Sequence, residues 1–230
     1  ELPNPTSQAT IDSIGALCKE HNCIGFSNDP DADRHIMIDE LGNAVSPEKI
    51  LAIILHYCNS TNINIQSVSS TLANSAIIKT ICQRINIVVH ETNIGFKFFT
   101  PYLKSADASN AISFGVESSG GFSMSSHSYD KCGFLPILII IGIMKKQGMP
   151  LSSLSNQIDE IFGKLIFVED ALVLDTREIG KLNYFAKTDR VSLQQLFETE
   201  IASISTSDGI KITFNNNDWV LSRPSGTEPL

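Results

Sequence analysis

Three aspartates alternate near the start of the chain, Asp29, Asp31 and Asp33, and Arg34 follows them directly. In an extended segment, alternate side chains point the same way, so this spacing predicts that three carboxylates meet at one point. Their charges repel one another unless a cation lies between them. We therefore predict a Mg²⁺ site with coordination positions left for water or a phosphoryl oxygen, and Arg34 beside it to bind a second phosphate oxygen.

Two other interpretations of the acidic segment remain open. A calcium-binding EF-hand loop starting at Asp29 would have its twelfth ligand at Glu40. Such a loop needs glycine where the chain has Arg34, and it needs flanking helices, whereas Cys23–Phe26 and Ile36–Ile38 have the composition of short strands. The other alternative is a solvated acidic turn. We favour the magnesium site.

A second loop carries Glu117 and Ser119, followed by two glycines. Side chains two residues apart can point the same way and offer an acceptor and a hydroxyl group to neighbouring sugar hydroxyls. The glycines allow the backbone to approach a ligand closely. A flexible Ser-Gly-Gly turn is the alternative interpretation.

A third loop near the end of the chain combines a guanidinium group, two hydroxyls and a glycine, in Arg223, Ser225, Gly226 and Thr227. Exposed backbone N–H groups beside an arginine are suited to binding phosphate. The alternative is a Pro-Gly turn with a surface arginine. Two such ligand-binding loops in an acidic protein favour a phosphorylated substrate.

The elements that must position these loops alternate between helix and strand. The order indicates an α/β fold of mixed sheets covered by helices in two domains, followed by a partial α+β C-terminal domain. Apolar spacing predicts helices over 8–20, 47–58, 73–84, 133–147, 151–162 and 177–187, and strands over 63–68, 85–89 and 164–169. The βαβ order from 63 to 89 predicts a parallel strand pair. Asn215–Asn217 separates two apolar segments and predicts a hairpin.

Composition narrows the class of protein. The chain has 230 residues, 42% of them hydrophobic, and a net charge of −8 without a basic run, so we expect no nucleic-acid partner. The longest apolar run, Phe134 to Met144, is shorter than the roughly 20 residues of a membrane span, and we interpret it as a core helix. Five cysteines without a C-x-x-C pair indicate reduced thiols and a cytoplasmic protein.

Four segments of the chain, taken in order, resemble motifs of the α-D-phosphohexomutase family. They are Asp29–Arg34, Thr92–Lys97, Gly115–Gly121 and Arg223–Pro229. Members of this family move phosphate between C1 and C6 of a hexose. The resemblance implies that residues 1–43 are the C-terminal part of the family's second domain with its metal loop. It makes 44–165 the third domain with the sugar-recognition loop, and 166–230 a partial fourth domain with the phosphate-binding loop.

The resemblance also implies a role for each candidate residue. Asp29, Asp31 and Asp33 would bind Mg²⁺, and Arg34 and Lys131 would act at the reacting phosphoryl group, Lys131 in proton transfer or phosphate contact. The hexose phosphate and hexose bisphosphate would be bound by Glu117, Ser119, Lys97, His127, Arg223, Ser225, Gly226 and Thr227. His127 and Lys131 lie in a segment similar to the family's His…Lys-Asp-Gly motif, with Cys132 where the family usually has aspartate.

Members of the family carry phosphate on a serine in a Thr-x-Ser-His-Asn-Pro-type loop, which this sequence lacks. Ser126-His127 is followed by Ser128-Tyr129 and lies inside the third-domain match. We therefore expect a missing N-terminal domain and little or no turnover by the 230 residues alone.

The expected function of the parent protein is that of a Mg²⁺-dependent phosphoglucomutase or phosphomannomutase. A phosphoglucosamine mutase is the alternative within the enzyme class, although its loop typically has histidine where this chain has Gly121. The non-enzymatic alternative is a phosphosugar-binding remnant, or an assembly partner beside a separately encoded first domain. No membrane partner is expected.

Overall fold

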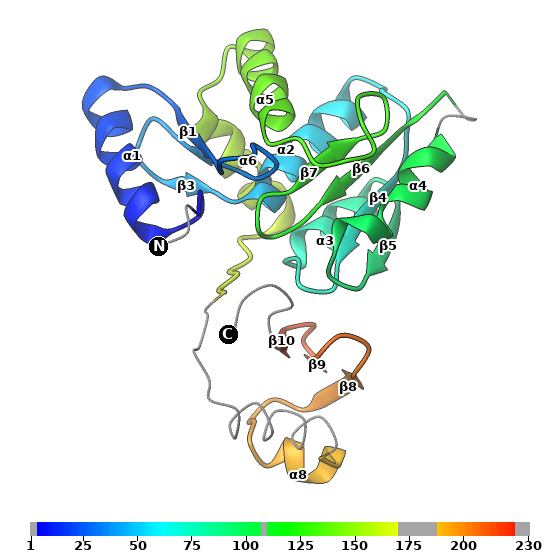
Figure 1. Cartoon of the computed structure of the whole chain (residues 1–230). Helices are drawn as coiled ribbons and strands as arrows, with labels where there is room; N and C mark the ends of the chain where they lie inside the picture. Colours follow the sequence, from blue (N-terminus) through cyan, green and yellow to red (C-terminus); the bar gives the residue numbers. More distant parts are fainter. Residues whose placement is uncertain (1–3, 107–109, 170–187, 224–230) are drawn as a thin grey trace. The chain divides into compact units, whose positions relative to one another are not determined.

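The computed structural model describes residues 4–106, 110–169 and 188–223. The chain divides into two compact units, Glu1–Phe167 and Val168–Leu230, each with its own strands and apolar core (Figure 1). They are called the first unit and the second unit below.

The first unit opens with α1 (Gln8–His21), which packs against a small antiparallel sheet. Ser7 caps this helix by accepting a hydrogen bond from the Thr10 N–H, and the helix matches the predicted span 8–20 closely. The sheet has the order β1 (Gly25–Asn28), β2 (His35–Ile38), β3 (Ala44–Val45). The acidic segment is therefore the loop of the β1–β2 hairpin.

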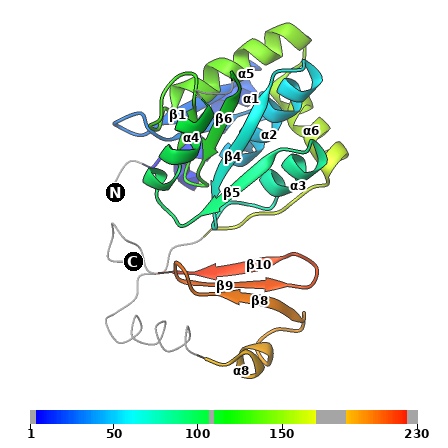
Figure 2. The same ribbon diagram turned by 90° about the vertical axis from the view of Figure 1, so that its right-hand side faces the viewer.

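A four-stranded sheet forms the centre of the first unit, in the order β5-β4-β6-β7 (Figure 2). Its strands are β4 (Ile65–Thr71), β5 (Val88–Thr92), β6 (Ile112–Val116) and β7 (Phe122–Met124). β4 pairs parallel with both β5 and β6, which confirms the predicted parallel pair, and β7 is antiparallel to β6. The strand predicted at 85–89 begins only at Val88, because Ile85 still bonds to Ile81 in the helical pattern and Asn86 then turns with φ +58°.

Helices cover both faces of this sheet. The main core lies between the sheet and α2 (Pro47–Ser60), α3 (Ile77–Arg84), α5 (Phe134–Gln147) and α6 (Leu151–Phe162). Phe114 and Val116 of β6 belong to that core, whereas Gly115 between them faces Phe99. Phe99 belongs to a second cluster with Phe96 and Leu103, from η1 (Phe96–Phe98) and α4 (Thr100–Ser105).

The expectation of a core helix at 134–144 is correct for one face of α5 only. Ile137, Ile140 and Ile143 are buried, but Leu138 and Ile141 on the other face are 65% and 42% exposed. Among the described residues, no single helix has both the length and the apolar composition of a membrane span; α5 and α6 reach them only as a pair bent by 89°.

The second unit contains α8 (Arg190–Gln194) and an antiparallel sheet of β8 (Ile201–Ser205), β9 (Ile210–Phe214) and β10 (Trp219–Ser222). The β9–β10 pair confirms the predicted hairpin. The strand predicted at 164–169 is wrong, because these residues have no regular structure. Ile166 and Val168 are 85% and 81% exposed, so these apolar side chains are not buried. The helix predicted at 177–187 lies outside the described residues.

Candidate substrate and metal site

The acidic loop brings its three aspartates together, but by a different geometry from the one predicted. The loop is a compact turn in which the Ala32 N–H donates to the Asp29 carbonyl at 3.0 Å and Ala32 has φ +57°. Asp29 Oδ1 accepts hydrogen bonds from the backbone N–H groups of Asp33 and Arg34, at 3.1 and 3.0 Å. The extended conformation assumed for the segment is therefore wrong, because these bonds curl the backbone. The convergence of the carboxylates is nevertheless present.

The donor set fits a small divalent cation. One carboxylate oxygen from each of Asp29, Asp31 and Asp33 lies within 4.8 Å of the others. Mg²⁺ holds oxygens at about 2.0–2.1 Å, so opposite oxygens in its octahedral shell are about 4.2 Å apart, and small movements of the side chains would complete part of that shell. The three residues differ in exposure, with Asp29 buried and Asp31 exposed, which leaves one side of the set open.

The EF-hand interpretation does not fit the structure. The strands β1 and β2 flank the loop where an EF-hand has helices. Glu40, the residue at the twelfth position, instead bonds to the backbone N–H and the hydroxyl group of Ser152 at the start of α6.

Two basic side chains neutralise part of the acidic loop. Arg34 Nε lies 2.5 Å from Asp29 Oδ2, and Lys131 Nζ lies 2.6 Å from Asp33 Oδ2. Burial alone would raise the pKa of Asp29, but hydrogen bonds from Arg34 outweigh it and lower that pKa to about 2. At Asp33, burial raises the pKa of the carboxyl group, the nearby Asp29 adds to the rise, and Lys131 opposes it. Asp29 is thus more firmly ionised than Asp33.

The predicted sugar-recognition loop is a tight turn between β6 and β7. The Glu117 N–H donates to Gly121 O at 2.9 Å, and the Gly120 N–H donates to Glu117 O at 3.1 Å. Ser119 lies partly buried in this turn. The Glu117 carboxylate is nearly buried and accepts a hydrogen bond from the Gly95 N–H. Burial raises the pKa of Glu117, while the charges of Lys131 and Arg34 oppose the rise and that of Asp33 adds to it.

Backbone hydrogen bonds join the acidic loop to the two loops that flank β7. The Gly133 N–H donates to Ala32 O at 2.9 Å, and the His35 N–H donates to Gly120 O at 3.1 Å. A Cβ added to Gly121 would lie 2.8 Å from Lys131 Cδ and 3.0 Å from Glu117 Oε2, so these two side chains flank one glycine. One site in the first unit therefore contains the residues predicted to bind metal, sugar and phosphoryl group: Asp29, Asp31, Asp33, Arg34, Glu117 and Lys131.

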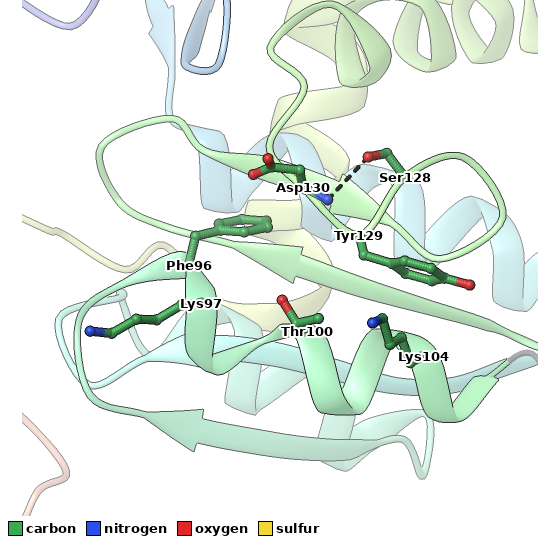
Figure 3. A pocket seen from close by; sticks show the side chains of 7 residues that line it. All are labelled: Phe96, Lys97, Thr100, Lys104, Ser128, Tyr129 and Asp130. Carbon is green, nitrogen blue, oxygen red and sulfur yellow. Dashed lines mark hydrogen bonds between the residues drawn. The ribbon is translucent and has the colours of Figure 1, made fainter.

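Two other predicted residues, Lys97 and His127, make no hydrogen bond or ion pair with the acidic loop among the described residues. Lys97 lies in η1 with its ammonium group 5.2 Å from the centre of the Phe98 ring. It lines a hollow of about 500 Å³ with Phe96, Thr100, Lys104, Ser128, Tyr129 and Asp130 (Figure 3). His127 is exposed in the turn after β7.

The predicted phosphate loop belongs to the second unit. Arg223 Nε donates to Asp208 Oδ1 at 3.3 Å, which holds the guanidinium group beside the turn before β9. Ser225, Gly226 and Thr227 lie outside the described residues.

Sequence reasoning missed His35, which directly follows the acidic loop. Its side chain is fully buried, and Nδ1 lies 2.7 Å from Gly120 O. Burial lowers the pKa of His35 to about 4 despite that bond, so the ring is neutral at pH 7. No local pattern could pair this residue with one 85 positions away.

Comparison with known proteins identifies relatives of the chain. The family model for phosphoglucomutase/phosphomannomutase, alpha/beta/alpha domain III, matches residues 46–161, half of the chain. A probable phosphoglucosamine mutase of Methanosphaera stadtmanae is 29% identical over 99% of this chain and 46% of its own length. The phosphoglucosamine mutase of Geobacillus kaustophilus is 27% identical over 95% and 44%. The chain thus spans less than half the length of these curated relatives.

Solved structures show the same fold. The crystal structure of a putative phosphomannomutase from Thermus thermophilus has a TM-score of 0.74 at 19% identity, over 96% of this chain and 45% of that one. The open form of Paramecium pp63/parafusin, a phosphoglucomutase, has a TM-score of 0.75 at 21% identity, over 99% and 43%. The half-chain match to the domain model, together with these relatives, identifies the chain as a member of the phosphoglucomutase/phosphomannomutase family, the α-D-phosphohexomutases.

Proposed function

We propose that this chain supplies the residues that bind the metal ion, the sugar hydroxyls and the phosphate groups in an enzyme that interconverts hexose 1-phosphate and hexose 6-phosphate. The reaction would pass through a hexose bisphosphate. The observation that carries the proposal is the meeting of three aspartates with Arg34, Lys131 and Glu117 in one site. The corresponding domains are 1–43, 44–165 and 166–230.

The residues of the acidic loop would prepare the site for the transferred phosphoryl group. Asp29, Asp31 and Asp33 would hold Mg²⁺, which when bound neutralises charge on that group. The bond from Arg34 Nε to Asp29 fixes the plane of the guanidinium group. Its two terminal amino groups have no partner among the residues that the structure describes, so they can donate to phosphoryl oxygens.

Lys131 and Glu117 would act on the sugar side of the reaction. The Lys131 ammonium group is held by Asp33 and can donate to a phosphoryl oxygen or exchange a proton with the reacting hydroxyl. The nearly buried Glu117 carboxylate can accept a hydrogen bond from a sugar hydroxyl. Ser119, Lys97 and His127 would add further substrate contacts.

Tight binding of the phosphate that is not transferred is the last part of the proposal. Arg223, Ser225, Gly226 and Thr227 would bind the phosphate that is not being transferred. The bisphosphate must bind in two orientations to exchange its phosphates, which calls for one strong phosphate contact and adaptable sugar contacts. Since the sequence has no Thr-x-Ser-His-Asn-Pro segment to donate phosphate, we expect the 230 residues alone to bind the bisphosphate without turning it over.

Two substrate classes have equal support. The sequence has Gly121 where phosphoglucosamine mutases typically have histidine, which favours glucose or mannose phosphates. The curated relatives named phosphoglucosamine mutase favour glucosamine phosphate. The five free cysteines fit the cytoplasmic location that we propose for either enzyme.

Calorimetry on the 230-residue chain tests the proposal. We expect glucose 1,6-bisphosphate or glucosamine 1,6-bisphosphate to bind in the presence of Mg²⁺, and the tighter ligand identifies the substrate class. Replacing Glu117→Gln keeps the size of the side chain but removes a charged acceptor, so it should weaken binding by roughly tenfold or more. The control is Glu160→Gln, at an exposed position of α6.

The outcomes separate the alternatives. Absence of binding to both bisphosphates would remove the proposed function. Binding without turnover in a coupled assay from glucose 1-phosphate to glucose 6-phosphate fits either a half-enzyme or the non-enzymatic phosphosugar-binding protein. Adding the phosphoserine domain of a relative then distinguishes the two, because only the half-enzyme gains activity. Robust turnover by the chain alone would refute the expected need for a separate phosphoserine.

A further inference from the structure

The carbonyl group of Gly120, in the predicted sugar-recognition turn, accepts two hydrogen bonds from His35, the first residue of β2 in the β1–β2 hairpin. The backbone N–H of His35 lies 3.1 Å from Gly120 O, and Nδ1 of the same residue lies 2.7 Å from it. A carbonyl oxygen can only accept, so Nδ1 must carry the hydrogen. His35 thus holds Gly120 at two points.

The two backbones touch at this place. A Cβ added to Gly120 would lie 2.4 Å from His35 O and 2.7 Å from His35 N, and Gly120 has φ +104°. Only glycine tolerates both the contact and the backbone conformation. Any displacement of the start of β2 must therefore move the turn that carries Glu117.

The side chain of His35 is also fixed on its other face. It is 0% exposed, and its ring lies edge-on to Phe122 with the ring centres 6.4 Å apart. Phe122 is the residue at which β7 begins, directly after the turn. One imidazole ring therefore contacts the sugar-recognition turn at Gly120 and again where the turn ends.

The second ring nitrogen shows which property of histidine matters here. His35 Nε2 is buried and has no hydrogen-bond partner among the described residues. An unpaired buried acceptor weakens a fold. A phenylalanine ring would fill the same space and would have no unpaired nitrogen. The imidazole ring therefore contributes the Nδ1–H donor, and the unpaired Nε2 is the cost of that donor.

We propose that His35 is a positioning residue that couples the two halves of the site, so that Mg²⁺ in the aspartate loop strengthens binding of a hexose bisphosphate at the Glu117 turn. His35 follows Arg34 directly, and its two hydrogen bonds to Gly120 would pass a shift of the aspartate loop to the turn. The inference rests on the proposed function, because it needs both ligands. By linkage, the bisphosphate strengthens Mg²⁺ binding by the same factor.

The test measures this coupling factor on the 230-residue chain by calorimetry. It is the ratio of the glucose 1,6-bisphosphate dissociation constants without and with saturating Mg²⁺. His35→Asn keeps an N–H donor near the position of Nδ1, whereas His35→Phe keeps a ring against Phe122 and removes the donor. We expect wild type and His35→Asn to share the coupling factor within about twofold. His35→Phe should lower it about tenfold, within the usual range of coupling between sites, and leave Mg²⁺ affinity alone unchanged.

A purely structural role predicts a different result. It would lower the melting temperature and weaken both ligands equally, leaving the ratio intact, and that outcome overturns the inference. So does a wild-type chain that binds both ligands without coupling, or a His35→Asn variant that loses coupling as fully as His35→Phe. His35→Leu provides the donor-free comparison if His35→Phe does not fold. A wild-type chain that binds neither ligand overturns the proposed function itself, and the inference with it.

Discussion

Charge balance at the acidic loop determines how the site can respond to a metal ion. Arg34 pairs with Asp29, and Lys131 pairs with Asp33. A cation bound by the three aspartates would share Asp33 Oδ2 with Lys131 and repel its ammonium group. Metal binding would therefore loosen Lys131 from Asp33 and leave its charge available for the substrate.

Removing the charge of Lys131 should strengthen Mg²⁺ binding. Lys131→Met has a side chain of similar length without a cation, so Asp33 loses its competitor and the metal loses a like charge. The pair is about one-quarter exposed, with 24% for Lys131 and 25% for Asp33, so screening keeps the effect modest. We expect roughly a threefold to tenfold gain in affinity at 0.15 M salt, measured by calorimetry.

Lys145→Met is the matched control, because Lys145 is exposed in the last turn of α5. Its Mg²⁺ affinity should equal that of the wild type. An unchanged or weaker Mg²⁺ affinity in Lys131→Met would contradict the proposed competition between Lys131 and the metal ion for the Asp33 carboxylate.

The alternating aspartates predict that three carboxylates meet, and in the structure one oxygen from each lies within 4.8 Å of the others. The sequence does not predict how they meet, because the left-handed conformation of Ala32 and the bonds to Asp29 Oδ1 arise only when the hairpin closes. Contacts such as Lys131 to Asp33 and His35 to Gly120 depend on the folding of distant segments. Periodicity carries no information about them.

At the scale of elements, apolar pattern predicts helices better than strand ends. The spans of α1 and α2 follow from one apolar face and a serine cap. Ile85 and Ile87 are apolar because they pack on the core from a connection, so they shift a pattern-based strand toward its N-terminus. A strand also needs a partner, and 164–169 has none among the residues that the structure describes.

A glycine contact fixes α1 against the turn between β2 and β3, and it can be tested by mutation. A Cβ added to Gly15 would lie 2.7 Å from Gly42 O in the turn between β2 and β3. Backbone cannot yield as a flexible side chain does, so Gly15→Ala should lower the free energy of unfolding by about 1–3 kcal/mol. Urea denaturation measures the change.

Gly142 of α5 is the counterpart, because no heavy atom lies within 4 Å of a Cβ added there. Alanine has a higher helix propensity than glycine, so Gly142→Ala should raise the free energy of unfolding by up to about 1 kcal/mol. If both substitutions stabilise the chain, the close approach of α1 to the turn between β2 and β3 does not limit the size of the residue at position 15.

At the scale of the whole molecule, stability and chemistry are divided unequally between the two units. The first unit has the large core and all six residues of the assembled site. Among the residues that the structure describes, the second unit has a core centred on Leu193, Ile201, Ile210, Ile212 and Phe214, and it carries the proposed phosphate-binding Arg223. A small core supports a small free energy of unfolding.

The two units should therefore unfold separately, the second at lower urea concentration. Trp219 is the only tryptophan of the chain and lies in β10, so its fluorescence reports the second unit alone. Circular dichroism at helical wavelengths reports mainly the first unit, which contains the long helices α1, α2, α5 and α6. Two-state unfolding of the whole chain would make the two transitions coincide.

Truncating one core at a time makes this prediction sharper. Leu193 is 0% exposed in the second unit and Leu154 is 2% exposed in the first, and each leucine-to-alanine change should cost about 2–5 kcal/mol in its own core. Leu193→Ala should shift the fluorescence transition and leave the dichroism transition and the Mg²⁺ affinity unchanged. Leu154→Ala should do the reverse for the two transitions. If either variant shifts both transitions together, the units fold as one cooperative body, and Arg223 is then thermodynamically linked to the aspartate loop.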